Sequence, residues 1–439
     1  MAAWPTWTEA QRRSLAERQL LRSLRPLTLS GDGTQVLVDP LTYREMLDNI
    51  PSVGGTSGLA SATTRLTLFA ANDYLGLSTH PAVRQAAAAA AAAHGNGPRG
   101  SALVCGYTHA HRELESALAE LEQAEEALLF PTGYAANMSV LGTFADSSQC
   151  AIFSDELNHA SIVDGARLAA RGAGAALHVY RHGDLRHLDE LLEASAAPRK
   201  LIVSDSLFSM DGDFADVGGL VRLKQRHGAL LCLDEAHGTL VCGERGGGVA
   251  ERAGVAAEVD VHVGTLSKAF GAQGGFVACS RAHKQLLLCR GRPAVFSTAL
   301  PAPTVAAALA ALREATPELR ETLWARIAQL GAACPGLRPP VSPIVPVVVG
   351  GEAAALGAAA TLLRRGLLVP AIRPPTVPRG TARLRIALSA AHSPADVARL
   401  AAALNELGLA GQAAVDGHGG GLSGASRAAT TDAPIVARL

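Results

Sequence analysis

The sequence predicts an α/β protein with a mainly parallel sheet in a large domain, followed by a smaller C-terminal α/β domain. From about residue 100 onward, helical stretches alternate with short runs that are apolar on both faces, as strands of a helix-covered parallel sheet are. After Pro301 the composition changes to alanine-rich helix and then to the strand-like runs SPIVPVVVG and RLRIAL. This change indicates the second domain.

Individual elements follow from the same patterns. An amphipathic helix is expected over residues 9–27, and the alanines 86–93 favour a helix on propensity alone. We interpret ELESALAELEQAEEALLF, residues 113–130, as helical. The apolar runs expected to form strands are CAIFS, KLIVSDS, ALLCLDE, VDVHVGT and GGFVACS.

Domain boundaries follow from the shifts in composition. We expect an N-terminal helix and segment over 1–70 with a surface insertion near 53–64, a large domain over 71–300, a smaller domain over 301–410 and a flexible tail over 411–439.

Charge and hydropathy exclude several classes of function. The 439 residues include 39 basic and 39 acidic side chains, so the formal net charge is zero. Binding to nucleic acid or to an anionic membrane needs clustered positive charge, which this chain lacks. It also lacks the uninterrupted run of ~20 apolar residues that a membrane helix needs. We therefore expect neither a nucleic-acid nor a membrane partner.

Cysteine usage and the C-terminus bear on the compartment. The seven cysteines are scattered and never in CxxC spacing, so neither a disulfide framework nor a zinc site is indicated, and a reducing compartment fits best. The final tripeptide, Ala437, Arg438 and Leu439, resembles a peroxisomal address and ends a Gly-, Ala- and Ser-rich tail. The expected location is thus cytoplasmic or peroxisomal.

Polar residues follow the predicted strands at the points where they end. Ser209 lies in SLFSMDGD, Asp234 and His237 in LDEAHG, and Thr265 and Lys268 in GTLSK. In a parallel α/β sheet, ligands collect beyond the carboxyl ends of the strands. These side chains are therefore expected to meet in one site.

The chemistry of this set favours pyridoxal 5′-phosphate (PLP). A lysine beside an apolar run is costly unless it is paired or used for chemistry. PLP needs a lysine for a Schiff base, a carboxylate for its pyridine nitrogen and donors for its phosphate. Each residue alone could have a purely structural role, as a helix cap, part of a turn or an ordinary hydrogen-bonded histidine. Their joint order and placement favour one site.

Two other motifs do not indicate a ligand-binding site. The aspartates of SMDGD lack the calcium-loop pattern, and we expect no metal. GERGGG, residues 243–248, lacks the strand-to-helix setting of a nucleotide loop.

Several stretches together resemble the α-oxoamine synthases, a family of PLP enzymes of fold-type I, the aspartate aminotransferase-like fold. The resemblance covers about three quarters of the chain. The stretches that carry it are NDYLGL, GYTHAHRELE, FPTGYAAN, NHASIVDG, SDSLFSMDGDFA, LDEAHGT, GTLSKAFG, FSTALP and AIRPPTVPRGTARLRIALSAAH.

The resemblance implies roles for five residues around the PLP ring. Lys268 would form the Schiff base, and Asp234 would bond the pyridinium nitrogen. His159 of NHAS would stack on the ring, while Ser209 and His237 would bond its phenolic oxygen.

At the phosphate, Gly133 and Tyr134 would offer backbone amides and Thr265 a hydroxyl. Ser297 and Thr298 of FSTALP would be phosphate contacts supplied by the partner subunit, which implies a homodimer.

For the amino-acid substrate, the resemblance points to Arg373 of AIRPP as the guanidinium that binds the carboxylate. Asn72 and Thr376 would be its neighbours. Arg22 would meet the acyl substrate.

Within the family, GYTHAH and IRPPTVP favour the biotin-pathway branch of the plant and algal kind, which joins L-alanine to a pimeloyl thioester. The Pro-Arg of GNGPRGSALVCGYTHAH departs from the small residues that relatives often have, and leaves the acyl preference open. The alternatives are 5-aminolevulinate synthase, 2-amino-3-ketobutyrate ligase and serine palmitoyltransferase, or a non-catalytic partner subunit. Such a subunit would lack the lysine, which is present here.

Overall fold

The structure is a computed structural model that describes residues 3–18, 20–49 and 63–409. All seven cysteines fall within these ranges and are free, as their spacing predicted. No helix in the described part of the chain is long and apolar enough to cross a membrane. The predicted insertion near 53–64 falls almost wholly outside the described residues. The tail over 411–439, with its C-terminal tripeptide, falls entirely outside them.

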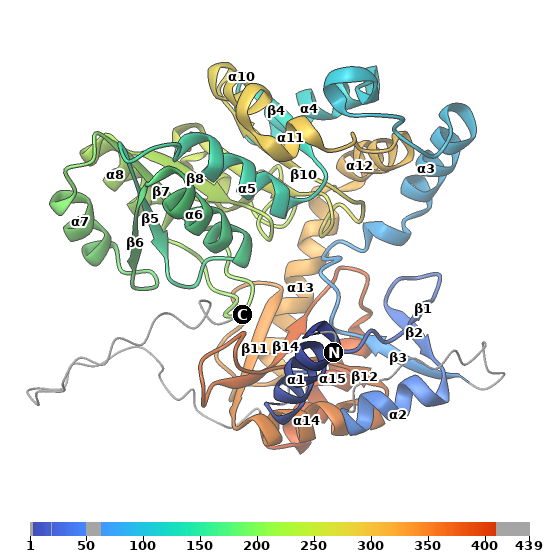
Figure 1. Cartoon of the computed structure of the whole chain (residues 1–439). Coiled ribbons are helices and arrows are strands. Elements are labelled where there is room, and N and C mark those ends of the chain that lie inside the picture. The colour runs from blue at the N-terminus through green and yellow to red at the C-terminus, as the bar shows by residue number, and fades with distance from the viewer. Residues whose placement is uncertain (1–2, 19, 50–62, 410–439) are drawn as a thin grey trace, which may run out of the picture.

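A seven-stranded sheet forms the centre of the large lobe (Figure 1). Its order is β4-β10-β9-β8-β7-β5-β6, and only β10 runs antiparallel to its neighbours. The strands are β4 (Glu126–Phe130), β5 (Cys150–Asp155), β6 (Ala176–Tyr180), β7 (Arg199–Asp205), β8 (Leu230–Asp234), β9 (Val261–Thr265) and β10 (Gly275–Cys279). The predicted α/β class and mainly parallel sheet are confirmed.

The central strands are apolar throughout because both faces of the sheet are covered. In β5, Ile152 faces the core formed with α5 (Gly133–Phe144) and α6 (Ala160–Ala173). The next residue, Phe153, faces the opposite core, which contains the apolar side of α7 (Leu185–Ala194) and α8 (Val217–His227). Alternating side chains of one strand thus fill two cores.

Further helices complete the large lobe. They are α3 (Pro81–His94), the π-helical turn η2 (Ala102–Gly106), α4 (His109–Leu121), α9 (Gly248–Arg252), α10 (Arg281–Arg290), α11 (Arg292–Phe296) and α12 (Ala302–Glu314), with short 3-10 turns at η1 (Leu77–Thr79) and η3 (Ala256–Glu258). The long helix α13 (Pro317–Ala333) runs from this lobe to the smaller one (Figure 1).

The smaller lobe combines both ends of the described chain. Its three-stranded antiparallel sheet is β11 (Ile344–Gly350), β14 (Ala382–Ala387) and β13 (Ala371–Ile372). Its four-stranded sheet is β1 (Thr28–Leu29), β2 (Gln35–Val38), β3 (Thr64–Leu68) and β12 (Leu367–Leu368). The helices of this lobe are α2 (Pro40–Asp48), α14 (Glu352–Arg364) and α15 (Pro394–Glu406). The predicted 1–70 segment therefore shares a sheet with the C-terminal domain through β3 and β12.

Two helix predictions were partly wrong. The N-terminal helix α1 spans Ala3–Glu17 rather than 9–27. None of its residues is buried, so no tertiary contacts stabilise a longer helix. The predicted helix over 113–130 divides into α4 and β4. Gln123 between them has a positive φ of 56°, which ends the helix and lets the apolar run ALLF enter the sheet.

The loop after β7, residues 206–214, belongs to the large lobe and contacts the small lobe. The Asp211 carboxylate forms an ion pair with Arg383 of β14 at 2.6 Å. The Ser342 hydroxyl donates a hydrogen bond to the Gly212 carbonyl at 2.7 Å. Gly212 has a φ of 66°, and a Cβ there would lie 2.1 Å from the Ile344 carbonyl oxygen, so only glycine fits. The small lobe is thereby held against the edge of the sheet where β7 ends.

Candidate active site

A cavity of about 240 Å³ opens at the carboxyl ends of the parallel strands. Seven of the residues predicted from sequence or resemblance line it, from four different segments. They are Gly133, Tyr134, His159, Asp234, His237, Thr265 and Lys268. Six further residues complete the lining: Thr132, Asn137, Ser161, Asp205, Ala236 and Ser267. The side chains that the strand-end rule selected therefore meet in one place, with the exception of Ser209.

Lys268 lies three residues beyond β9, and its Nζ is 2.9 Å from Nε2 of His237. Burial lowers the pKa of Lys268 to about 8, although the carboxylates of Asp234 and Asp205 act in the opposite direction. Burial and the Lys268 charge together lower the pKa of His237 well below its usual value. A neutral imidazole thus faces an amine that loses its proton near physiological pH.

Asp234, the last residue of β8, has both carboxylate oxygens bonded. Asn137 of α5 donates its Nδ2 to Oδ2 at 2.6 Å, and the backbone N–H of Ala236 donates to Oδ1 at 2.9 Å. Asn137 also donates to the Ser161 hydroxyl at 2.9 Å. Since Asn137 Nδ2 bonds both groups, it fixes the orientation of the carboxylate that faces the cavity.

Asp205 is a second carboxyl group in the cavity, and sequence reasoning missed it. It ends β7 directly opposite Asp234 in the sheet register. Asp205 is 3% exposed, and its Oδ1 is buried with no hydrogen-bond partner. Burial and the neighbouring Asp234 raise the pKa of Asp205 well above its usual value. This carboxyl therefore holds its proton more tightly than a solvent-exposed aspartate does.

His159 caps the N-terminus of α6 and lines the cavity. Its Nδ1 lies 2.7 Å from the Ser161 hydroxyl and accepts the Ser161 backbone N–H at 3.2 Å. Desolvation lowers the pKa of His159, against the effect of Asp234 and together with that of Lys268. A neutral ring with a fixed orientation is therefore available for stacking.

One end of the cavity is built to hold an anion. Helix α5 begins at Gly133, with the Thr132 hydroxyl accepting the N–H of Ala135 at 3.0 Å as its cap. The first N–H groups of a helix lack partners within it and carry partial positive charge. A Cβ on Gly133 would come within 3.2 Å of the Thr265 Cβ. The Thr265 side chain, with its hydroxyl, therefore lies beside the start of α5.

A buried guanidinium belongs to the same region. Arg385 of β14 is 5% exposed and donates from Nη1 and Nη2 to Oδ1 of Asn72 at 3.2 and 3.1 Å, and from Nε to the Ser209 carbonyl at 2.5 Å. These acceptors are neutral. By contrast Arg383, two residues earlier, pairs with the Asp211 carboxylate. Arg385 therefore keeps its capacity to bind a carboxylate.

The other predicted substrate residues are not gathered in this cavity. Arg373 follows β13 and lies 4.0 Å from the Glu352 carboxylate. Thr376 and Arg22 are exposed. Ser209 lies four residues beyond β7, and its carbonyl rather than its hydroxyl bonds Arg385.

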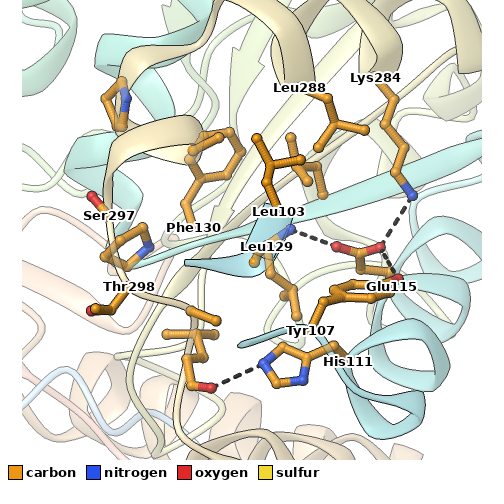
Figure 2. A pocket seen from close by; sticks show the side chains of 17 residues that line it. Leu103, Tyr107, His111, Glu115, Leu129, Phe130, Lys284, Leu288, Ser297 and Thr298 are labelled. Atoms are coloured by element: carbon orange, nitrogen blue, oxygen red, sulfur yellow. Dashed lines mark hydrogen bonds and ion pairs between the residues drawn. The ribbon is translucent and has the colours of Figure 1, made fainter. Parts of the chain in front are cut away.

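Ser297 and Thr298 line a different cavity, of about 330 Å³, shown in Figure 2. Its walls are mostly apolar and include Leu103, Phe130 and Leu288. The two cavities lie on either side of the chain at 130–133. Phe130 and Pro131 line this one, and the next two residues line the other. At its polar end Tyr107 and Lys284 both donate to Glu115, at 2.8 and 3.1 Å.

Comparison with known proteins decides the family. The family model of class I and II aminotransferases matches residues 64–404. The chain belongs to this family. Within it, the chain is 46% identical to the 8-amino-7-oxononanoate synthase of Arabidopsis thaliana, over 92% of this chain and 95% of that protein. The 8-amino-7-oxononanoate synthase of Anaeromyxobacter dehalogenans (strain 2CP-1) is 47% identical, over 92% of this chain and 97% of that protein.

Solved structures of the family share the fold. A serine palmitoyltransferase from S. paucimobilis with a bound PLP–myriocin aldimine matches with a TM-score of 0.79 at 28% identity, over 93% of this chain and 100% of that one. The resemblance to the α-oxoamine synthases and the predicted PLP fold-type I are confirmed, and PLP is the cofactor of the family.

The residues of the cavity fit PLP on structural grounds alone. Two buried polar atoms that line it, Asn137 Oδ1 and Asp205 Oδ1, have no partner within the protein. The start of α5 suits a phosphate, the carboxylate of Asp234 suits a pyridinium, and Lys268 is the amine for a Schiff base. No group of three or more His, Cys, Asp or Glu side chains in the described ranges is placed to hold a metal ion.

Some missed residues carried a sequence signal. Asp205 ends the run KLIVSD, so the strand-end rule applied there more directly than to Ser209. Arg383 and Arg385 alternate with Leu384 and Ile386 in a strand that is buried along its whole length. Buried charges in such a strand indicate a pairing or a ligand. Asn137 carried no comparable signal.

Proposed function

We propose that this chain joins L-alanine to a pimeloyl thioester and releases 8-amino-7-oxononanoate, carbon dioxide and the free thiol, a step of biotin biosynthesis. The observation that carries the proposal is that Lys268 and Asp234 line one cavity, while the buried Arg385 donates to neutral oxygens of Asn72 and Ser209. The 46–47% identity to 8-amino-7-oxononanoate synthases supports it. Lys268, which lines the cavity, argues against a non-catalytic subunit.

PLP supplies an electron sink for the α-carbon of the bound amino acid. The protein supplies the base: Lys268, with a pKa of about 8, is a free amine in roughly a tenth of molecules at pH 7 and in about half at pH 8, and as the free amine it can take the Cα proton. His237 holds the amine at 2.9 Å, while Asn137 holds the Asp234 carboxylate toward the ring nitrogen. His159 would cover the ring face. Each of these residue roles is part of the proposal.

Arg385 is our candidate for the group that binds the alanine carboxylate, in place of Arg373. Arg385 is buried and bonds only neutral oxygens. Hydrogen bonds through Asn72, Tyr74 and His237 link it to Lys268. Arg373 is directed instead toward Glu352. A bidentate carboxylate bond from Arg385 would orient the substrate with its α-carbon near the amine.

The working unit is proposed to be a homodimer. Leu103, Val104 and Phe296, near the second cavity, expose 55%, 82% and 71% of their surfaces. A cluster of exposed apolar side chains of this kind is typical of a protein–protein interface. Ser297 and Thr298 lie on the same side, outside the cavity of Lys268. A second copy on this face would cover these apolar side chains. The hydroxyls of Ser297 and Thr298 would then lie at the phosphate-binding end of the PLP cavity in that second copy.

Subunit complementation tests this arrangement. Lys268→Ala and the double variant Ser297→Ala, Thr298→Ala should each have little activity alone. If the hydroxyls serve the partner's site, a mixed dimer contains one complete site, and refolding an equal mixture should restore about a quarter of wild-type activity by random pairing. If they serve their own subunit, no site is complete and activity does not return.

The substrate assignment is tested by assaying the PLP-loaded protein with L-alanine, glycine and L-serine against pimeloyl, succinyl, acetyl and palmitoyl thioesters. Each thioester is offered on CoA and on a carrier protein. We expect 8-amino-7-oxononanoate from L-alanine and the pimeloyl donor to dominate. A preference for glycine or serine would assign the chain to one of the sister synthases instead. Peroxisomal delivery through the C-terminal tripeptide stays a prediction.

A further inference from the structure

A continuous path of hydrogen bonds connects Arg385 to Lys268. The Asn72 Oδ1 that accepts from Arg385 lies 3.1 Å from the Tyr74 hydroxyl, which in turn lies 2.6 Å from His237 Nδ1. His237 Nε2 lies 2.9 Å from Lys268 Nζ. Tyr74 is fully buried, and His237 and Arg385 are 6% and 5% exposed. Water therefore has little access to this path.

The hydroxyl of Tyr74 has one hydrogen and two possible acceptors. An amide oxygen has two lone pairs, and in Asn72 these face the two Nη groups of Arg385. The hydrogen is then directed along the shorter contact, to Nδ1 of His237. That imidazole must carry its own hydrogen on Nε2, from which it donates to the lone pair of the Lys268 amine. This arrangement favours neutral Lys268.

A carboxylate bound to Arg385 would change this order. Its oxygens would take the two Nη donors, and Asn72 would be free to accept the Tyr74 hydrogen. His237 could then carry its hydrogen on Nδ1 and accept from Lys268 through Nε2. We propose that Tyr74 is a positioning residue that sets which nitrogen of His237 is protonated, and so couples a carboxylate at Arg385 to the proton affinity of Lys268. The amine would become a stronger base once the substrate is in place.

Several charged or titratable groups surround this path. The groups that affect Lys268 and His237 are Asp234 from β8, Asp205 from β7, Arg385 from β14 and His159 at the start of α6. Of these four groups, Arg385 also interacts directly with the Tyr74 hydroxyl. The substitution Tyr74→Phe removes none of the four. A change confined to Tyr74 therefore alters the path while leaving these charges in position.

The inference rests on the proposed function, but its test needs no acyl donor and no turnover. Apoprotein takes up PLP only when Lys268 is unprotonated, so the uptake rate against pH, followed by visible absorption, reports its protonation. For the wild type we expect a midpoint near the Lys268 pKa of about 8. Propionate, which has the carboxylate of alanine without its amine, should raise the midpoint by roughly 0.5 to 1 pH unit, as expected for one hydrogen bond.

Tyr74→Phe removes only the hydroxyl. We expect its midpoint without propionate to rise by a similar roughly 0.5 to 1 unit, because His237 is no longer held as an Nε2–H donor. Propionate should then cause no further shift. Tyr43→Phe is the matched control, since its hydroxyl contacts the Leu363 carbonyl in the small lobe at 3.5 Å and should leave both midpoints at wild-type values.

Asn72→Ala provides a second variant that does not depend on the folding of Tyr74→Phe. Without Asn72 the Tyr74 hydrogen can only go to His237, so the midpoint without propionate should match the wild type and propionate should have no effect. The proposal is overturned if propionate shifts the midpoint equally in the wild type and in either variant, or not at all in the wild type. The condensation assay above would stand in either case.

Discussion

Lys268→Ala should lower the rate of 8-amino-7-oxononanoate formation by on the order of a thousandfold or more, because the variant loses both the covalent attachment of PLP and the base. The fold should survive, since the substitution removes a buried amine that is costly to keep in an apolar setting. The measurement is turnover at saturating L-alanine and pimeloyl thioester, with the melting temperature of the same preparation recorded alongside.

Lys200→Ala is the matched control. Its Nζ donates to the Leu192 carbonyl at 2.7 Å near the start of β7, at the opposite end of the strand from Asp205 and the cavity. It should keep wild-type turnover and the visible absorption of bound PLP, whereas Lys268→Ala loses both. Retention of substantial activity by Lys268→Ala would remove this lysine from the mechanism.

Arg385→Gln should raise the KM for L-alanine by about 10- to 100-fold, the effect of losing a charge-assisted hydrogen bond to a carboxylate. The KM for the pimeloyl thioester should change much less, because the proposed role of Arg385 is to bind the carboxylate of alanine. Initial rates with each substrate varied in turn separate the two effects.

Two other arginines serve as comparisons. Arg383→Gln removes an equally buried guanidinium from the same strand, but one that already pairs with Asp211, so it should lower the melting temperature with a smaller effect on the KM for alanine. Arg373→Gln tests the position that the sequence resemblance favoured. A larger rise in KM for alanine with Arg373→Gln than with Arg385→Gln would restore Arg373 as the carboxylate-binding residue.

Local sequence was sufficient where the site follows directly from the sheet. Parallel strands bring their carboxyl ends to one edge, so Asp234, His237, Thr265 and Lys268 could be placed together from the ends of apolar runs. The same rule applied to β7 selects Asp205 rather than Ser209, because the strand ends at that residue and the chain then turns toward the small lobe.

The parts of the site that could not be predicted depend on tertiary contacts. Arg385 belongs to the small lobe and reaches the site only because that lobe is held against the loop at 206–214. Tyr74 and Asn72 are brought to His237 and Arg385 across 163 and 313 residues of sequence. No periodicity or composition within a single segment contains that information.

The fold shows the same division. The strands buried on both faces were predictable from their apolar runs, but β4 was hidden within a stretch of helical composition and ends up pairing with β10. The N-terminal helix was misplaced because α1 buries none of its residues, which leaves its ends to weak local preferences.

The central claim is that Lys268 binds PLP in this cavity and exchanges it with L-alanine. Borohydride reduction of the PLP-loaded protein, followed by mass spectrometry of its peptides, tests both parts. We expect the pyridoxyl label on Lys268 alone, and we expect saturating L-alanine before reduction to remove it from the protein as a labelled amino acid. A label on any other lysine, or a Lys268 label that L-alanine does not displace, would contradict the account.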